Sequence, residues 1–152
     1  TGPIPKELGA LSKLESLYLQ RNGLTGHIPP QLGDLGTLEH LHLSINELDG
    51  ELNRSKCVFF LRVLNMHESR ARVGHIPPQL GDLGALKHLF IDVNKLDGPI
   101  PPELGNLAAL QVLFLNGNNL RGPIPPELGN LAALKYLYLR NNNLSGELWS
   151  AT

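Results

Sequence analysis

A single glycine position recurs every 24 residues along the whole chain. It is occupied at Gly2, Gly26, Gly50, Gly74, Gly98, Gly122 and Gly146, and an isoleucine or leucine stands two residues after each of them. The segment GPIPPELGNLAAL occurs twice without change, at Gly98–Leu110 and Gly122–Leu134. A period of this length indicates one supersecondary unit that is repeated and stacked, because a single unit of this size cannot bury its own hydrophobic face.

Each unit combines the patterns of a strand, a turn and a short helix. In the first full unit, Leu17 and Leu19 alternate with other residues, which is the period of a strand with one buried face. Three residues after the second strand leucine stands an asparagine whose amide can satisfy backbone groups exposed where the chain turns. These are Asn22, Asn46, Asn94, Asn118 and Asn142. Proline then fixes an extended segment, and Pro-x-x-Leu-Gly-x-Leu suits a helical turn that closes the coil.

The complete pattern, LxxLxxLxLxxNxLxGxIPxxLGxL, resembles the plant-type leucine-rich repeat and covers nearly all of Gly2–Leu148. The resemblance implies an α/β repeat solenoid, a curved horseshoe segment. Its parallel β-sheet forms the concave face, and short 3-10 or irregular turns form the convex face. The LxGxIP segments are expected to add short second strands. We expect one domain over residues 1–152, with about six 24-residue repeats, cut from a longer protein.

One unit, residues 51–73, breaks the pattern. It separates two verbatim copies of GHIPPQLGDLG, and residues such as Lys56 and Cys57 replace the leucine and glycine of the outer turn. Leu61, Leu64 and Met66 still occupy strand positions, so the pattern predicts a coil that keeps its strand in the sheet and loses its standard back. The sequence leaves open whether this unit has drifted or is a functional loop.

The irregular outer turn is also expected to be the weakest part of the stack. Segments Asn53–Cys57 and Glu68–Val73 are predicted to exchange their amide hydrogens faster than Asn106–Leu110, because they lack the proline–leucine–glycine framework.

The positions that differ between units flank the strand leucines and are expected to face solvent on the concave side. The first column reads Ser16, His40, Val63, His88, Val112 and Tyr136. The second reads Tyr18, His42, Asn65, Phe90, Phe114 and Tyr138, and the third reads Gln20, Ser44, His67, Asp92, Asn116 and Arg140. Every strand therefore presents a different triplet on a nearly constant frame.

Five of the eight aromatic residues fall in these columns, and clustered solvent-facing rings are typical of contact surfaces. We predict a partner-binding site on the C-terminal half of the concave face. It comprises His88, Phe90, Asp92, Phe114, Asn116, Tyr136, Tyr138 and Arg140. The alternative is that the rings only stack across strands and stabilise the sheet.

Composition and motifs exclude several other functions. The net charge is −1, with 13 basic and 14 acidic residues in no blocks, which gives no reason to expect nucleic acid or an anionic membrane as partner. The longest strictly apolar run, Cys57–Leu61, is far too short for membrane insertion. The single cysteine, Cys57, excludes an internal disulfide. No nucleophile elbow, phosphate loop or HExxH motif is present, so we expect neither an enzyme nor a cofactor. His42 and His67 could meet across neighbouring strands, but no third ligand is placed to complete a metal site.

The family resemblance also implies a role. Proteins with such repeats include receptor-like kinases, receptor-like proteins and the algal ROCO GTPases of signalling and innate immunity, and their repeats bind peptides, proteins or other domains without catalysis. We therefore expect a recognition module that binds a protein or peptide through its concave face. The alternative is a regulatory scaffold that docks on a GTPase, kinase or NB-ARC-type domain of its own chain.

Overall fold

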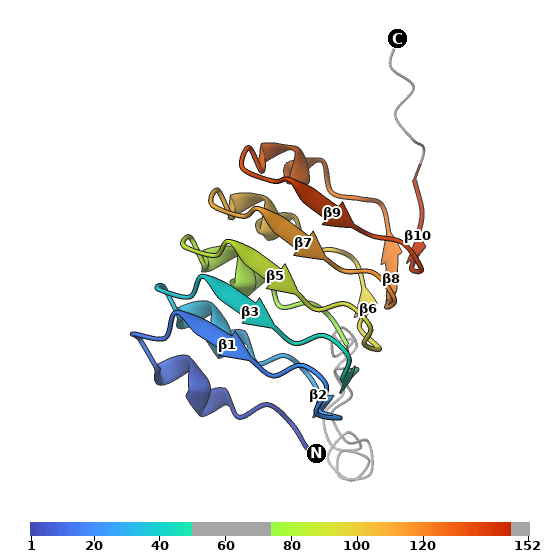
Figure 1. Cartoon of the computed structure of the whole chain (residues 1–152). Helices are drawn as coiled ribbons and strands as arrows, with labels where there is room; N and C mark the ends of the chain where they lie inside the picture. The colour runs from blue at the N-terminus through green and yellow to red at the C-terminus, as the bar shows by residue number, and fades with distance from the viewer. Residues whose placement is uncertain (50–73, 147–152) are drawn as a thin grey trace, which may run out of the picture.

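The computed structural model describes residues 1–49 and 74–146, and these form a stack of coils (Figure 1). One strand of each coil lies in a five-stranded parallel sheet, in the order β1-β3-β5-β7-β9. Their bounds are β1 (Ser16–Tyr18), β3 (His40–His42), β5 (His88–Phe90), β7 (Val112–Phe114) and β9 (Tyr136–Tyr138). We call this the concave sheet. It confirms the predicted leucine-rich solenoid.

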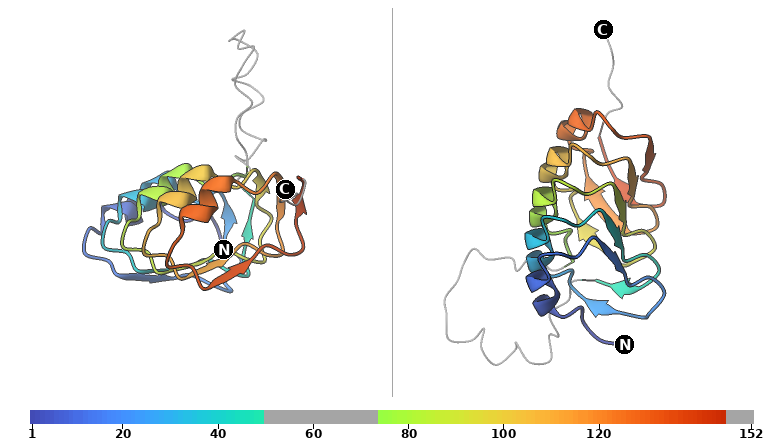
Figure 2. Two further views of the ribbon diagram at one scale, coloured as in Figure 1. Left: turned by 90° about the horizontal axis from the view of Figure 1, so that it is seen from above. Right: turned by 60° about the vertical axis from the view of Figure 1, so that its left-hand side comes forward.

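Short 3-10 helices lie on the side of the stack opposite the concave sheet (Figure 2). They are η1 (Lys6–Ala10), η2 (Pro30–Asp34), η3 (Pro78–Asp82), η4 (Pro102–Asn106) and η5 (Pro126–Asn130). Each begins directly after a proline with extended backbone, and η2 to η5 also start on a proline, which suits a helix start because it lacks the N–H that would have no partner there. The expected 3-10 turns of the convex face are confirmed.

Between the two faces, the LxGxIP segments form the second strands that the resemblance implied. β2 (Thr25–Gly26) pairs with β4 (Glu47–Leu48), and β8 (Asn119–Gly122) lies between β6 (Asp97–Gly98) and β10 (Asn143–Leu144). All of these pairs are parallel, as stacking of like coils requires.

Leucine side chains fill the interior of the stack. The central residues of the strands, such as Leu41, Leu89 and Leu113, stand in register with one another and are fully buried. The flanking strand residues point out of the core, as the period-two alternation predicts.

A ladder of asparagine side chains joins each coil to its neighbour. The Asn118 amide nitrogen donates to the carbonyl oxygens of Ile91 and Leu115 at 3.1 and 3.0 Å, and its oxygen accepts from the Leu96 amide at 3.1 Å. Asn46, Asn94 and Asn142 make equivalent bonds. The predicted structural role of this position is therefore confirmed.

The stack continues without a break across residues 50–73. β3 pairs directly with β5, with Leu41 opposite Leu89, and we call this pairing the seam. On the far side of the coil, a side chain at Gly33 of η2 would collide with the backbone of Gln79 in η3, so these helices are in close contact. Asn94 crosses the seam as well, because its oxygen accepts from the Leu48 amide at 3.2 Å.

Asp49 and Gly74, which border residues 50–73 in the sequence, lie at one place in this coil. Gly74 has a φ of +93° and lies so close to Asp49 that a Cβ there would be 2.5 Å from the Asp49 carbonyl oxygen. The next outer segment bonds to both sides of the junction: the Lys95 amide donates to the Leu48 oxygen at 2.9 Å, and the Asp97 amide donates to the Gly74 oxygen at 2.8 Å. Residues 38–49 and 74–84 thus make one coil.

The prediction that the irregular unit keeps a strand between those of its neighbours is wrong. No position for it exists, because β3 and β5 are hydrogen-bonded to each other. Leu61, Leu64 and Met66 lie outside the described residues, as do the segments Asn53–Cys57 and Glu68–Val73 for which faster exchange was predicted. Residues 50–73 number 24, the length of one repeat, which is why the glycine frame stays constant across them.

Side-chain chemistry at the seam matches this register. Lys87 Nζ lies 2.8 Å from Glu39 Oε1, and Lys95 Nζ lies 3.3 Å from Glu47 Oε2. The Ser44 hydroxyl donates to the Asp92 carboxylate at 2.5 Å. Surface ion pairs contribute little free energy individually, but opposite charges in register favour this pairing over a shifted one.

We expect Asn118→Ala to lower the free energy of unfolding by about 1–3 kcal/mol, because the Leu96 amide and two carbonyl groups lose buried partners. Urea melts check this. The matched control is Asn119→Ala, which changes the exposed asparagine directly after Asn118 and should leave the midpoint nearly unchanged. Equal effects of the two substitutions would contradict a stabilising ladder.

We expect removal of residues 50–73, which joins Asp49 to Gly74, to give a folded chain that melts no lower than the parent. Asp49 and Gly74 already meet at one point of the coil, and fewer residues between them reduce the entropy cost of bringing them together. The matched control removes Gly98–Arg121, a described segment of equal length. That deletion takes a complete coil from the stack and should lower the melting temperature clearly, since each coil is stabilised by its neighbours. An equal loss of stability in both deletions would contradict the conclusion that residues 38–49 and 74–84 form one coil.

Candidate functional site

A continuous row of rings crosses all five strands of the concave sheet. It consists of Tyr18, His42, Phe90, Phe114 and Tyr138, and we call it the ring row. Successive ring centroids are 4.7, 4.1, 4.9 and 4.4 Å apart along it. Each ring is the last residue of its strand and follows a leucine that points inward, so the strand alternation brings the rings to one side.

The rings meet mainly edge to face. Phe90 and Phe114 are inclined by 84°, and Phe114 and Tyr138 by 90°, which places the positive edge of one ring against the negative face of the next. Tyr18 and Tyr138 end the row and are 54% and 45% exposed, whereas the three inner rings are half-buried by their neighbours. The row therefore stabilises the sheet and still offers an apolar surface to solvent.

Three imidazoles lie together at the seam, two of them beside the ring row and one within it. His40 Nδ1 lies 2.7 Å from His88 Nδ1, with the two rings stacked at 4.7 Å, and His42 is the ring-row member on the same strand as His40. We call His40, His42 and His88 the histidine cluster. A bond between two Nδ1 atoms needs one donor and one acceptor, so the pair adopts two different tautomers when neutral.

The surroundings of His42 and His88 oppose the protonation of these two imidazoles. Burial, and then the nearby charges of His40, Lys87 and Lys135, lower the pKa of His88. Burial, followed by His40 and His88, also lowers the pKa of His42, against the opposite influence of Asp92. The hydrogen bond from Lys87 lowers the pKa of Glu39, so this carboxylate stays ionised beside the cluster.

The structure brings part of the predicted binding site together. Phe90, Phe114 and Tyr138 are consecutive in the ring row, and the His88 ring lies 6.2 Å from that of Phe90. The remaining predicted residues lie around them: Asp92 accepts from Ser44, Tyr136 is 57% exposed, Asn116 is half-buried and Arg140 is exposed. Their assignment to a binding site stays a prediction.

Sequence reasoning missed the N-terminal half of this surface. It placed Asn65 between His42 and Phe90 and so interrupted the row, whereas His42 and Phe90 are direct neighbours. The contact that the sequence allowed between His42 and His67 involves a residue outside the described part, and the histidine pair that does form is His40–His88. The available signal was the chemical match at a spacing of 48 residues, such as Glu39 with Lys87.

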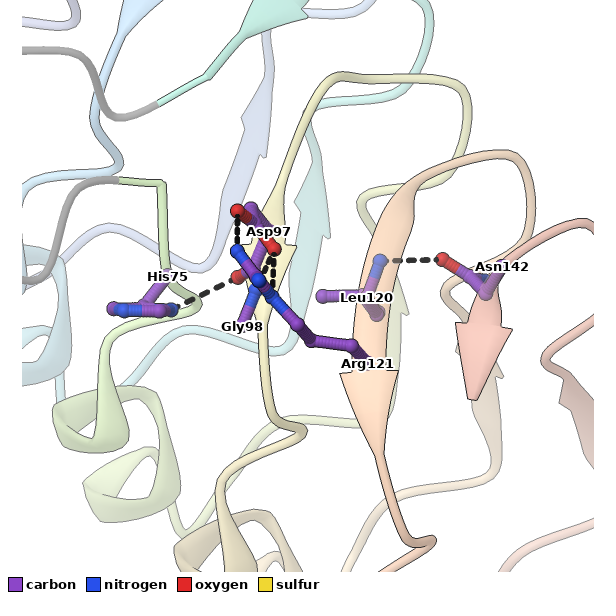
Figure 3. A network of polar contacts seen from close by, with 6 residues as sticks. All are labelled: His75, Asp97, Gly98, Leu120, Arg121 and Asn142. Atoms are coloured by element: carbon purple, nitrogen blue, oxygen red, sulfur yellow. Dashed lines mark hydrogen bonds and ion pairs between the residues drawn. The ribbon is translucent and has the colours of Figure 1, made fainter. Parts of the chain in front are cut away.

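A second polar network lies on the outer flank (Figure 3). The Arg121 guanidinium grips the Asp97 carboxylate with two nitrogens, and the Gly98 amide donates to Asp97 Oδ1 at 2.5 Å. Burial would raise the pKa of Asp97, but these donors outweigh it and lower that pKa. His75 Nδ1 lies 2.9 Å from the Asp97 carbonyl oxygen. The network ties β8 to β6, so we assign it to the frame.

Other kinds of site find no support within the described ranges. In residues 1–49 and 74–146, no three histidine, cysteine or acidic side chains converge closely enough to hold a metal ion. Within the same part of the chain, no helix has the length and apolar character needed to cross a membrane. A groove of about 780 Å³ lies beside the LxGxIP segments, and half of its twelve described lining residues are prolines. The polar residues of the described lining are His27, His75, Gln79 and Glu103.

Stacked coils that carry a variable sheet on an invariant frame define a solenoid protein of the repeat class. The family model of the Leucine Rich Repeat matches residues 13–35, 85–107, 109–131 and 133–151, more than half of the chain. The chain therefore belongs to the leucine-rich repeat family. The matches omit residues 36–84, which contain the coil that is completed across the junction.

Solved structures of plant receptors share this fold. The plant peptide hormone receptor RGFR1 in complex with RGF2 matches 97% of this chain, at 33% identity and a TM-score of 0.80, over 20% of its own length. The Arabidopsis receptor kinase HAESA, in complex with the peptide hormone IDA and the co-receptor SERK1, matches 98% of this chain at 37% identity and a TM-score of 0.79, over 21% of its own length.

A plant ice-binding protein is also similar, with 32% identity and a TM-score of 0.75 over 95% of this chain and 39% of its own. This chain thus spans less than half of each of the three proteins. The comparison with curated proteins found no match to this sequence.

We expect the chain to lose stability as the pH falls below about 6.5, the ordinary pKa of histidine. Because the pKa values of His42 and His88 are lowered on folding, the unfolded chain takes up more protons in that range, which favours unfolding. Glu39 and Asp97, whose pKa values are lowered from 4.5 and 3.8, lose their contribution only at lower pH.

Thermal melts at about pH 7 and about pH 5 check this expectation. The double substitution His42→Gln/His88→Gln should reduce the drop in melting temperature, and His27→Gln, which removes an exposed imidazole on the outer flank, should retain it. An unchanged drop in the double variant would contradict the assignment to these two imidazoles.

Proposed function

We propose that this chain is a non-catalytic recognition module that binds a protein or peptide ligand on the concave sheet. The observation that carries the proposal is the ring row. Natural solenoids vary the side chains of an open face while the frame stays constant, and rigid aromatic side chains supply much of the binding energy of interfaces. Here the five rings lie on five different strands and are all at least partly exposed.

The dimensions of the row suit an extended peptide. Neighbouring strands are about 4.8 Å apart, so five strands carry the row over roughly 19 Å. A peptide in extended conformation advances about 3.3 Å per residue, so about six residues would cross the sheet from Tyr18 to Tyr138. The rings would contact such a peptide along its length, and the first and third columns would contact it from both sides.

The comparisons support binding of this kind. RGFR1 and HAESA, which share the fold at more than 30% identity, are described in complex with RGF2 and with the peptide hormone IDA. Their ligands are not assigned to this chain, which spans about a fifth of each receptor. We place the centre of the site at the predicted residues Phe90, Phe114 and Tyr138, and we extend it to Tyr18 and His42.

An intramolecular role is the second candidate. A GTPase, kinase or NB-ARC-type domain of the same protein would use the concave sheet as a fixed docking surface. Ring–ring contacts that only stabilise the sheet are compatible with either role. The two roles differ in what occupies the concave sheet. In the first role, the sheet is open and binds a separate peptide. In the second, a domain of the same protein covers the sheet and blocks binding of an added peptide.

We expect Phe114→Ala and Tyr138→Ala each to weaken ligand binding by at least about 2 kcal/mol, as for other buried interface rings. Their melting temperatures should stay within a few degrees of the parent, because both side chains stand outside the leucine core. Leu113→Ala, by contrast, should cost about 2–5 kcal/mol of stability through the cavity it leaves.

The ligand for this measurement comes from selection of a displayed library of random peptides against the immobilised chain. Calorimetry with the best selected peptide then compares the variants. The matched control is Glu127→Lys, an exposed change on η5 at the convex face, which should bind like the parent. If both ring variants bind normally and Glu127→Lys loses binding, the ligand site lies on the convex face and the proposed concave site is wrong.

A further inference from the structure

We infer that the histidine cluster at the seam is a binding site for a ligand carboxylate, and that it strengthens as the pH falls from neutral to mildly acidic. The inference rests on the proposed function, because the cluster lies in the same concave surface. It adds the chemical class of one ligand group and the condition under which that group is held.

The histidine cluster forms because β3 pairs directly with β5 at the seam. His40 and His88 are 48 residues apart in the sequence and would not be neighbours if another strand lay between β3 and β5. They lie on inner strands of the sheet, and the His42 ring contacts both Tyr18 and Phe90. All three imidazoles are half-buried and keep part of their surface in solvent.

The contact between the two Nδ1 atoms determines how the pair takes up protons. When the pair is neutral, one ring donates its Nδ1–H to the other, and the donor ring carries a free lone pair on Nε2. The first added proton binds that Nε2 atom and leaves the Nδ1 contact intact. The contact then becomes charge-assisted, which offsets part of the effect by which burial lowers the pKa of His88. A second proton would require the acceptor Nδ1 and would break the bond, so the pair holds one positive charge.

The acidic and basic side chains around the histidine cluster are equal in number, so protonation of the histidines decides the net charge of this region. Glu15 beside β1, Glu39 beside β3 and Asp92 after β5 are balanced by Lys87, Lys135 and Arg140 beside β5 and β9. The strand β7 contributes only Val112, Leu113 and Phe114. Glu39 is engaged by Lys87 through one oxygen and lies 3.9 Å from His40 Nε2 with the other, and Asp92 accepts from Ser44. Because Glu39 favours an N–H on His40 Nε2, His40 is the acceptor of the Nδ1 contact, and the Nε2 atom that is left for a ligand is that of His88.

A carboxylate is the ligand group that this arrangement suits best. A protonated imidazole pair presents an N–H donor with a positive charge, and the neighbouring rings reduce the exposure of that charge to water. Charge-assisted bonds to carboxylates are short and about twice as strong as neutral ones. The carboxylate can belong to an acidic side chain or to the end of a peptide, and the two sources are separated by experiment.

Fluorescence polarisation of the full chain with three labelled peptides tests the site. The probes are amidated hexaglutamate, hexaglutamine with a free carboxyl terminus, and amidated hexaglutamine as the uncharged reference. We expect one or both of the carboxylate probes to bind at least about five-fold more tightly at about pH 5.5 than at about pH 7.5, from one added charge near the protein surface. The glutamate probe itself loses charge on acidification, so its own titration works against the effect.

Substitutions assign the effect to the cluster. His40→Gln/His88→Gln should abolish the gain on acidification, while His27→Gln on the outer flank should keep it, with all variants melted beforehand at both pH values. In the unsubstituted chain, saturating hexaglutamate should shift the NMR titration of the paired imidazoles to higher pH, because binding and protonation are linked. This measurement needs no variant to fold.

Equal affinity at both pH values, or a gain that survives in the double variant, overturns the site. That outcome leaves the proposed function intact if Phe114→Ala and Tyr138→Ala still lose the selected peptide. If instead the selected peptides ignore the ring row while the carboxylate probes behave as expected, the recognition module is rejected and the carboxylate site stands.

Discussion

The asparagine ladder is the interaction on which the other features depend. The side-chain nitrogen of each of four asparagines donates to carbonyl groups of two consecutive coils, and the side-chain oxygen accepts from a backbone amide of the preceding coil. These are Asn46, Asn94, Asn118 and Asn142. Strands of three residues are too short to form a stable sheet alone, so the coils must be held at the same height and rotation. The ladder supplies that alignment from inside the stack and leaves the outer side chains of the sheet free to vary.

The seam shows how far this alignment extends. Asn94 reaches back to Leu43 and Leu48 with the same bonds that Asn118 makes to Ile91 and Leu96, although the first pair of coils is separated by 24 additional residues. The ladder bonds therefore depend on the residue pattern of the adjoining coil and not on how far away that coil lies in the sequence. The concave surface inherits this property, since the ring row and the histidine pair are both completed across the seam.

The fold was predictable from the sequence wherever the information is local. Leucine spacing, the asparagine position and the prolines before each helix indicate the core, the ladder and the 3-10 turns within one period, and all three are observed. Pairing across the seam was not predictable from periodicity, because residues 50–73 have the length of one full repeat and leave every later leucine in phase. The chemical matches of Glu39 with Lys87 and Glu47 with Lys95 carried the missing information. The same limit applied to the candidate site. The sequence indicated its C-terminal rings, whereas Tyr18, His40 and His42 could be added only once the strand order was known.

The meeting of Asp49 and Gly74 has a consequence for the order in which this chain assembles. Contacts between other neighbouring coils join residues about one repeat apart, such as Leu120 and Asn142, whereas those at the seam join residues up to 51 apart. Doubling the length of a closed loop adds roughly 0.6 kcal/mol of entropy cost, and formation of distant contacts is slower than that of near ones. The coils on either side can each propagate through near-neighbour contacts, so docking of the two blocks at the seam is the step with the highest contact order. Folding of this solenoid is thus expected to resemble the joining of two short repeat arrays more than growth from one end.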